Sequence, residues 1–231
     1  MLKRQKTIVS IVVVLVLLLS VVVVGPVIYG LIMGPGVKTE GLNTSSAEPA
    51  TVEVNGDWEV VRGDQNNLTS VGYTFAEILP VEHRITSGST QAVEGTVNIS
   101  NDTLNAGEIT VDMRELSSDN ERRDINVRMS IFHTDDYPTS TFTITEPVDL
   151  STVPDDGTPG QVELVGDLEI HGATNEVSGT FDVLRDEDKV VIAGNLPVNR
   201  IDFGLESPEF VAAKIAEEGE LNIRISLGKE Q

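Results

Sequence analysis

Apolar and polar residues alternate along the chain from Trp58 onward, in short runs separated by Gly, Pro, Asn and Asp. Successive side chains of a strand point to opposite faces, so this period of two predicts antiparallel strands with one buried face. The alternating runs are residues 71–75, 93–99, 109–113, 142–144, 164–170, 181–183, 190–192, 201–205 and 221–227. About eight or nine such runs in one domain predict an all-β barrel or sandwich.

Two segments show helical signals instead of alternation. Residues 117–130 contain polar residues at a plausible helix start, and residues 207–217 begin with Ser207 and Pro208, a capping residue followed by a proline at the first helical position. The pattern therefore predicts an all-β domain with one or two short helices between strands.

A different pattern occupies the N-terminus, where residues 8–32 carry no charged side chain. At a rise of roughly 1.5 Å per residue, 25 residues reach about 37 Å, which exceeds a hydrocarbon core of about 30 Å. A cleavable signal peptide is the alternative, but its apolar core normally has about 7–15 residues. We therefore predict a transmembrane helix that is retained as a signal anchor.

The charges around this run predict its orientation. Lys3, Arg4 and Lys6 precede it, and every acidic residue follows it. The positive-inside rule then places residues 1–7 in the cytoplasm and the C-terminal domain on the outer, extracytoplasmic side of the cytoplasmic membrane.

Residues 33–56 have neither helical nor strand periodicity and contain Pro35, Pro49 and several Ser, Thr and Asn residues. Such composition is typical of a flexible linker. The predicted organisation is a basic tail of residues 1–7, a transmembrane helix of residues 8–32, a linker of residues 33–56 and one β-domain of residues 57–231. A chain of 231 residues has room for one anchor and one domain of ordinary size.

Charge and cysteine content exclude several functions. The chain has 37 acidic and 16 basic residues, and after the first seven residues 13 basic ones remain, a balance of −24. Binding of nucleic acid or of an anionic leaflet through a basic patch is therefore disfavoured. The absence of cysteine excludes disulfides, thiolate metal sites and thiol nucleophiles, and is more typical of a bacterial or archaeal envelope than of animal secretion.

Four ordered segments resemble the YceI-like family, and the resemblance extends from Trp58 to Leu227. Residues 111–124 (VDMRELSSDNERRD) resemble its strand, polar turn and Arg-Asp pair, and residues 129–142 (MSIFHTDDYPTSTF) its acidic turn, Tyr-Pro and following Phe. Residues 166–174 (GDLEIHGAT) and 199–205 (NRIDFGL) resemble two further elements. The resemblance implies a lipocalin-like, extended antiparallel β-barrel of about eight strands that sequesters a long isoprenoid chain.

The alternation also supplies candidates for the lining of such a cavity. For each of them, packing as ordinary core is the alternative, because about eight strands can either fill their interior or hold one small ligand. The candidates are Tyr73, Phe75, Val97, Val111, Met113, Phe132, Phe142, Leu168, Ile170, Phe181, Phe203 and Ile223. Burial of about ten methylene-sized groups yields roughly 8 kcal/mol before ordering costs, so an apolar ligand can bind without a cofactor. The resemblance implies that this ligand is an isoprenoid, such as an isoprenoid quinone or a polyprenol.

Arg122, Arg123 and Asp124 are candidates for contact with a polar head group, since arginine binds phosphate bidentately. An Arg–Asp pair that holds the short helix against the barrel explains the same residues and is the favoured interpretation.

His133, Asp135 and Asp136 are residue types that bind divalent metals, but they precede Tyr137-Pro138, where turn chemistry explains them. We therefore predict no metal site. His83 and His171 are expected as isolated histidines in loops.

Two other function classes compete with lipid binding. A hydrolase would need a nucleophile elbow, and the sequence contains no G-x-S-x-G. An envelope protein-interaction or structural module with a filled core fits an anchored β-domain as well. The prediction is a lipid-binding protein that is not an enzyme; the sequence leaves its oligomeric state open.

Overall fold

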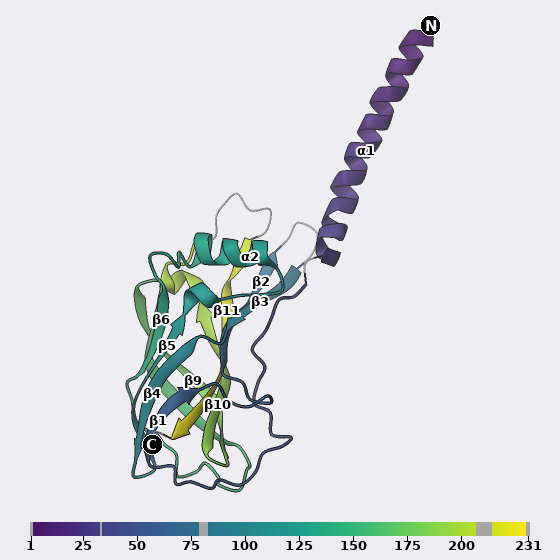
Figure 1. The fold of residues 1–231 in the computed structure, drawn as a ribbon. Helices are drawn as coiled ribbons and strands as arrows, with labels where there is room; N and C mark the ends of the chain where they lie inside the picture. The colour runs from purple at the N-terminus through teal and green to yellow at the C-terminus, as the bar shows by residue number, and fades with distance from the viewer. Residues whose placement is uncertain (1, 33, 79–82, 207–213, 230–231) are drawn as a thin grey trace. The chain divides into compact units, whose positions relative to one another are not determined.

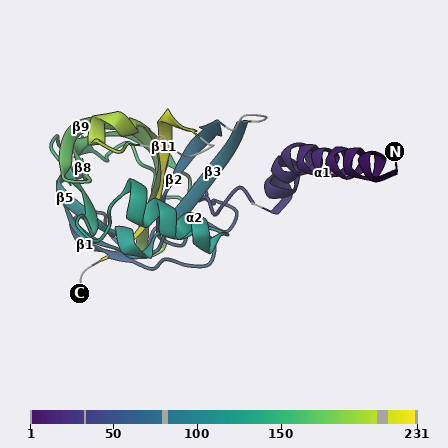
Figure 2. The same ribbon diagram turned by 90° about the horizontal axis from the view of Figure 1, so that it is seen from above.

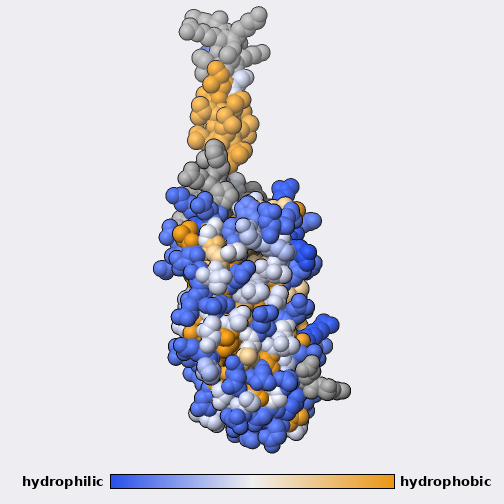
Figure 3. Space-filling model, turned by 90° about the vertical axis from the view of Figure 1, so that its left-hand side faces the viewer, coloured by the Kyte–Doolittle hydropathy of each residue, from blue (hydrophilic) through white to orange (hydrophobic). Residues whose placement is uncertain are grey.

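The computed structural model describes residues 2–32, 34–78, 83–206 and 214–229, and it forms two compact units, residues 1–35 and 36–231. The first unit is one helix, α1 (Leu2–Ile32), whose described side chains give it a hydrophobic surface (Figure 3). Within the described residues, however, no helix has both the length and the apolar character needed to cross a membrane.

The second unit is an antiparallel β-barrel. Its wall closes because β1 pairs with β4 on one side and with β11 on the other. The closed circuit, seen from above in Figure 2, has eight strands in the order β1 (Gly56–Val61), β4 (Val93–Ser100), β5 (Thr103–Asp112), β6 (Thr139–Ile144), β8 (Gly160–Ile170), β9 (Ala173–Asp186), β10 (Lys189–Asn199) and β11 (Lys214–Lys229). The predicted all-β class is confirmed, and the structure selects the barrel over the sandwich.

Strand β11 is long enough to serve two neighbours. Its C-terminal part pairs with β1, and its N-terminal part pairs with β2 (Ser70–Ile78), which forms a hairpin with β3 (His83–Thr90). The β2–β3 hairpin thus extends the wall at one end of the barrel (Figure 1). A two-residue strand, β7 (Val148–Asp149), pairs with the start of β5 at the other end.

A short helical segment lies over the end of the barrel that carries the β2–β3 hairpin (Figures 1 and 2). It comprises η1 (Met113–Glu115), α2 (Glu121–Asn126) and one π-helical turn, η2 (Val127–Ile131). The helix predicted over 117–130 therefore starts later: Asn120 caps it, while Ser118 Oγ donates to Asp124 Oδ1 at 2.5 Å.

The second predicted helix is corrected where the structure describes it. Residues 207–213 lie outside the described residues, but residues 214–217 belong to β11 and are strand. A further short helix, η3 (Arg200–Phe203), lies before this segment. The Arg200 guanidinium donates to the carbonyls of Leu205, Ile215 and Ala216, which joins η3 to the start of β11.

Residues 36–55 lie against the barrel and do not form the free linker that was expected. The Thr39 and Ser70 hydroxyls are 2.8 Å apart and buried, and Asn43 and Asn67 exchange two hydrogen bonds of 3.0 and 2.9 Å. Val54 is buried, and its carbonyl accepts from the Trp58 indole at 2.8 Å. The segment is ordered by polar contacts with the barrel, which leave no periodic signature in the sequence.

Candidate functional site

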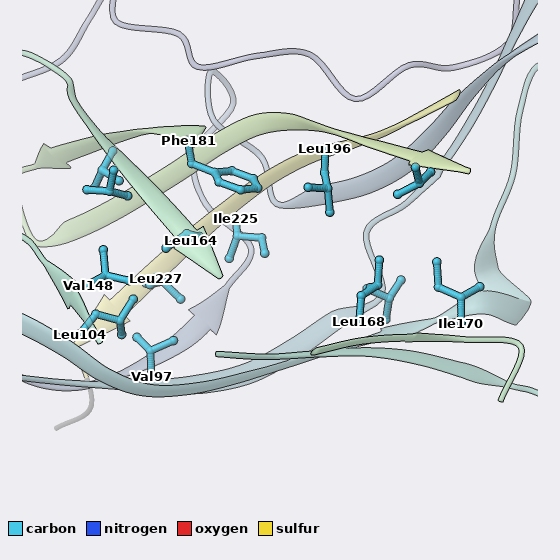
Figure 4. Packing of buried hydrophobic residues seen from close by; sticks show 14 of the residues in the cluster. Val97, Leu104, Val148, Leu164, Leu168, Ile170, Phe181, Leu196, Ile225 and Leu227 are labelled. Carbon is cyan, nitrogen blue, oxygen red and sulfur yellow. The ribbon is translucent and has the colours of Figure 1, made fainter. Parts of the chain in front are cut away.

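The barrel interior holds an apolar cavity of about 120 Å³. Side chains from strands on all sides point into this space (Figure 4). Its lining includes Val97, Leu104, Leu164, Leu168, Ile170, Phe181, Leu196, Ile225 and Leu227. Water is poorly held by such a lining, because an ordered water molecule needs two to four polar partners.

The alternating sequence accounts for this lining strand by strand. Along β8, Leu164, Leu168 and Ile170 are buried at every second position, and Gly166 occupies an inward position between them. A Cβ on Gly166 would lie 2.5 Å from Phe142 Cζ, so the glycine gives the Phe142 ring its space. Glycine and aromatic residue together shape this part of the cavity wall.

Ten of the twelve residues singled out as lining candidates contact the cavity. They are Tyr73, Val97, Val111, Met113, Phe132, Phe142, Leu168, Ile170, Phe181 and Ile223. Phe75 instead packs beside Gly219, where the β2–β11 register shifts, and Phe203 is buried in η3. Whether any of the ten contacts a ligand stays a prediction.

Several lining residues were not among the candidates. Leu164, Ile225 and Leu227 lie in alternating runs and share the parity of candidates on the same strands, so the pattern could have identified them. Ser140 and Thr141 also line the cavity, and Ser140 Oγ donates to the Glu169 carbonyl at 2.5 Å. No apolar pattern marks these two residues.

Tyr73 brings a phenol to the cavity wall. Its side chain is buried, and its ring centroid lies 6.0 Å from that of Phe132, which follows η2. Burial raises the pKa of the Tyr73 phenol well above its usual value, an effect that Arg123 partly opposes and that Asp124 and Glu77 reinforce. The phenol therefore stays neutral at physiological pH and keeps its hydrogen-bond donor.

The charged residues of α2 are held by contacts within the protein. Arg123 Nη1 lies 2.8 Å from Asp119 Oδ1, and the Arg123 side chain is 9% exposed. Asp124 is buried and accepts from Ser118, while Arg128 Nη1 donates to the Leu116 carbonyl at 2.7 Å. An Arg–Asp pair therefore fixes the helix, with Asp119 rather than Asp124 as the partner of Arg123. A head-group role for Arg122, Arg123 or Asp124 stays untested.

The histidines are placed differently from expectation. His171 is not isolated: its ring centroid lies 4.3 Å from that of Tyr137 and 5.4 Å from that of His133. The His133 carbonyl accepts from the Asp136 and Tyr137 amides, as turn chemistry predicts. His83 begins β3 rather than lying in a loop. Among the described residues, no three His, Asp or Glu side chains form a group that could hold a metal.

A second pocket, of about 390 Å³, lies at the end of the barrel opposite α2. Its wall includes Asp102, Asp155 and Arg185, and Arg185 Nη2 donates to the Val52 carbonyl at 3.3 Å. Its polar wall does not suit an apolar ligand.

Known proteins resemble this chain in sequence and in fold. Residues 64–227 match the sequence profile of the YceI-like domain. BcnA of Burkholderia cenocepacia superimposes with a TM-score of 0.55 at 18% identity, over 68% of this chain and 95% of that one. A polyisoprenoid binding domain from Saccharophagus degradans, implicated in plant cell wall breakdown, gives 0.58 at 16% identity, over 75% and 98%. At these identities the two structures support the fold alone. A search of curated proteins finds no match.

Proposed function

The chain belongs to the YceI-like domain family, and from this premise we propose that its barrel binds an isoprenoid or another lipid-like molecule and stores or carries it. The observation that carries the proposal is the cavity inside the barrel with its almost wholly apolar lining. Such a site recognises its ligand by the burial of hydrocarbon, and it needs neither a catalytic group nor a cofactor.

The cavity volume limits the ligand. One water-sized group needs about 10–15 Å³ by the same measure, so a cavity of about 120 Å³ accepts on the order of ten methylene-sized groups. Their burial is worth roughly 8 kcal/mol before ordering costs of several kcal/mol. About two isoprene units would thus fit without change, and a longer polyprenol or quinone tail would require side chains to move apart.

The polar end of the ligand is proposed to lie near Tyr73. Most of the lining offers no donor, whereas the Tyr73 phenol stays protonated and can donate to the oxygen of a quinone or an alcohol. An isoprenoid chain with one small oxygenated head group satisfies both parts of the site.

A protein-interaction or structural module with a filled core is the second candidate. It is favoured by the close packing of Val97, Leu104 and Leu227, which line the cavity yet are themselves buried by their neighbours. The two candidates differ in whether the cavity is occupied in the native protein.

Location at a membrane is a separate proposal, and the sequence alone supports it. Residues 8–32 carry no charge and follow three basic residues, which would place the barrel on the extracytoplasmic side. Fractionation of the native host with alkaline carbonate extraction tests this: an anchored chain stays in the pellet, and a chain without an anchor is released.

The test of ligand binding is native mass spectrometry with organic extraction of the full chain, purified in mild detergent from its own host. A stoichiometric isoprenoid supports the proposal. Val177→Phe would project an aromatic ring into the cavity and should abolish retention, whereas Ser178→Phe, on the outer face of the same strand, should not. An empty wild-type barrel, even after incubation with quinones and polyprenols, would favour the filled-core module.

A further inference from the structure

Exposed apolar side chains of the barrel unit gather around the end covered by α2. Ile125 and Met129, on α2 and η2, are 50% and 47% exposed. Tyr137 is exposed and packs against His171, in the turn between β8 and β9. Ile201 is exposed in η3, which lies near the start of β9 because the Asn175 side chain donates a hydrogen bond to the Asp202 carbonyl. We call Ile125, Met129, Tyr137 and Ile201 the α2-end patch.

The helical segment beneath this patch is apolar on two sides. Val127 and Ile131 are buried toward the barrel, while Ile125 and Met129 face solvent. The residues that flank the helix, Leu116 and Phe132, line the cavity. A single short segment therefore joins two residues of the patch, Ile125 and Met129, to the wall of the cavity.

Charge distinguishes this segment from the rest of the domain. Residues 114–128 contain four arginines and four carboxylates, a balance of zero, whereas the chain beyond residue 7 carries −24. Arg114 and Arg123 are paired with Asp112 and Asp119. Exposed Asp135, Asp136 and Asp202 lie near the patch and would disfavour an anionic partner. The helical segment itself combines exposed apolar side chains with a charge balance of zero, which suits a neutral partner.

We propose that the α2-end patch docks on the surface of a lipid bilayer with neutral head groups, into which Ile125 and Met129 insert. This inference rests on the proposed function, because a water-insoluble ligand reaches the cavity from a lipid phase. Apolar side chains on a short helix that lies at the polar–apolar boundary are the usual means of such docking. The rest of the acidic surface, of which Figure 3 shows one mainly hydrophilic face, remains in water.

The chain contains no cysteine, so single introduced cysteines report the docking site without interference. Met129→Cys probes the patch. Ser151→Cys is the matched control, because Ser151 is exposed at the opposite end of the barrel. It follows β7, which pairs with the start of β5, whereas α2 follows the end of β5. Each full-length variant carries an environment-sensitive fluorophore and is added to phosphatidylcholine vesicles with brominated acyl chains. Docking predicts a blue shift and quenching at residue 129 and neither at residue 151.

A second pair of variants tests whether the two side chains cause the docking. A fluorophore on Ile201→Cys should be quenched by the brominated vesicles when the rest of the chain is unchanged. Adding Ile125→Gln and Met129→Gln should remove that quenching, while the circular dichroism spectrum and the melting temperature stay the same. Quenching that survives the double substitution, or is absent at residue 129, overturns the proposal. A blue shift at residue 129 that grows with protein concentration without vesicles identifies a second copy of the chain as the occupant and also overturns it.

The same preparations separate this proposal from the proposed function. Organic extraction that finds an isoprenoid in a protein that does not dock refutes the docking surface alone. An empty barrel that docks through residue 129 refutes the ligand and retains the surface.

Discussion

The ring of Phe181 occupies the space that a side chain at Gly194 would need: a Cβ on Gly194 would lie 2.7 Å from Phe181 Cδ1. Phe181 lines the cavity from β9, and Gly194 lies on the neighbouring strand β10. The glycine therefore sets the position of an aromatic ring in the cavity wall.

Gly194→Ala should destabilise the barrel by about 1–3 kcal/mol, because the new methyl group overlaps the Phe181 ring. Urea unfolding followed by the fluorescence of Trp58, the single tryptophan of the chain, measures this cost. In a Phe181→Ala background the same substitution should cost about 1 kcal/mol less, since Cγ, Cδ1 and Cε1 of the ring, the atoms nearest to the new methyl group, are gone. Additive effects of the two substitutions would show that the contact does not limit this site.

The buried Tyr73 phenol should lower the unfolding free energy of the protein at alkaline pH. Its folded-state pKa is raised above its unfolded value of about 10, chiefly by burial, so its contribution to stability is complete below about pH 10 and is lost as pH rises from there toward the folded pKa. Tyr73→Phe should flatten the dependence of unfolding free energy on pH above about pH 10. Identical profiles for the two proteins would place the phenol in a more solvated environment.

Asn67 connects residues 36–55 to the barrel. Its buried side chain accepts from the Asn43 amide and donates to the Asn43 carbonyl. Asn67→Ala should lower the unfolding free energy by about 1–3 kcal/mol, because Asn43 loses partners that are shielded from water. Asn66→Ala, which removes one exposed hydrogen bond to Ser46, is the control and should stay within about 0.5 kcal/mol. Equal effects would mean that the segment contributes no stability through this contact.

The sequence predicted the barrel well because burial imposes a period of two. Leu164, Leu168 and Ile170 follow that period, and the same positions lie in the cavity wall. Phe203 also fits the alternation, yet it belongs to η3, since Asn199 caps a helical turn that a parity count does not detect. A run of alternating residues thus identifies the buried face of a strand but not where the strand ends.

Contacts between distant polar residues were beyond the sequence. Thr39 and Asn43 lie in a segment with the composition of a linker, yet hydrogen bonds to the buried residues Ser70 and Asn67 order them. Likewise Arg123 forms an ion pair with Asp119, one turn before it, although Asp124 is adjacent in the sequence. The hydrogen-bond partners of polar side chains depend on the three-dimensional arrangement of the chain, which the hydropathy pattern of the sequence does not show.

Arg123 is expected to act on the helix rather than on the ligand. Its side chain is nearly buried and pairs with Asp119, whose other carboxylate oxygen accepts from the Gly36 amide at 3.3 Å. Arg123→Ala should therefore cost about 1–2 kcal/mol of unfolding free energy, a value reduced from that of a buried pair because Asp119 is 34% exposed. Arg122→Ala, at an exposed position of the same helix, should cost no more than about 0.5 kcal/mol. The ligand recovered per mole of folded protein should be the same in both variants, since neither arginine belongs to the cavity wall that is proposed to hold the isoprenoid. Loss of ligand from folded Arg123→Ala protein would instead assign this arginine to the head group.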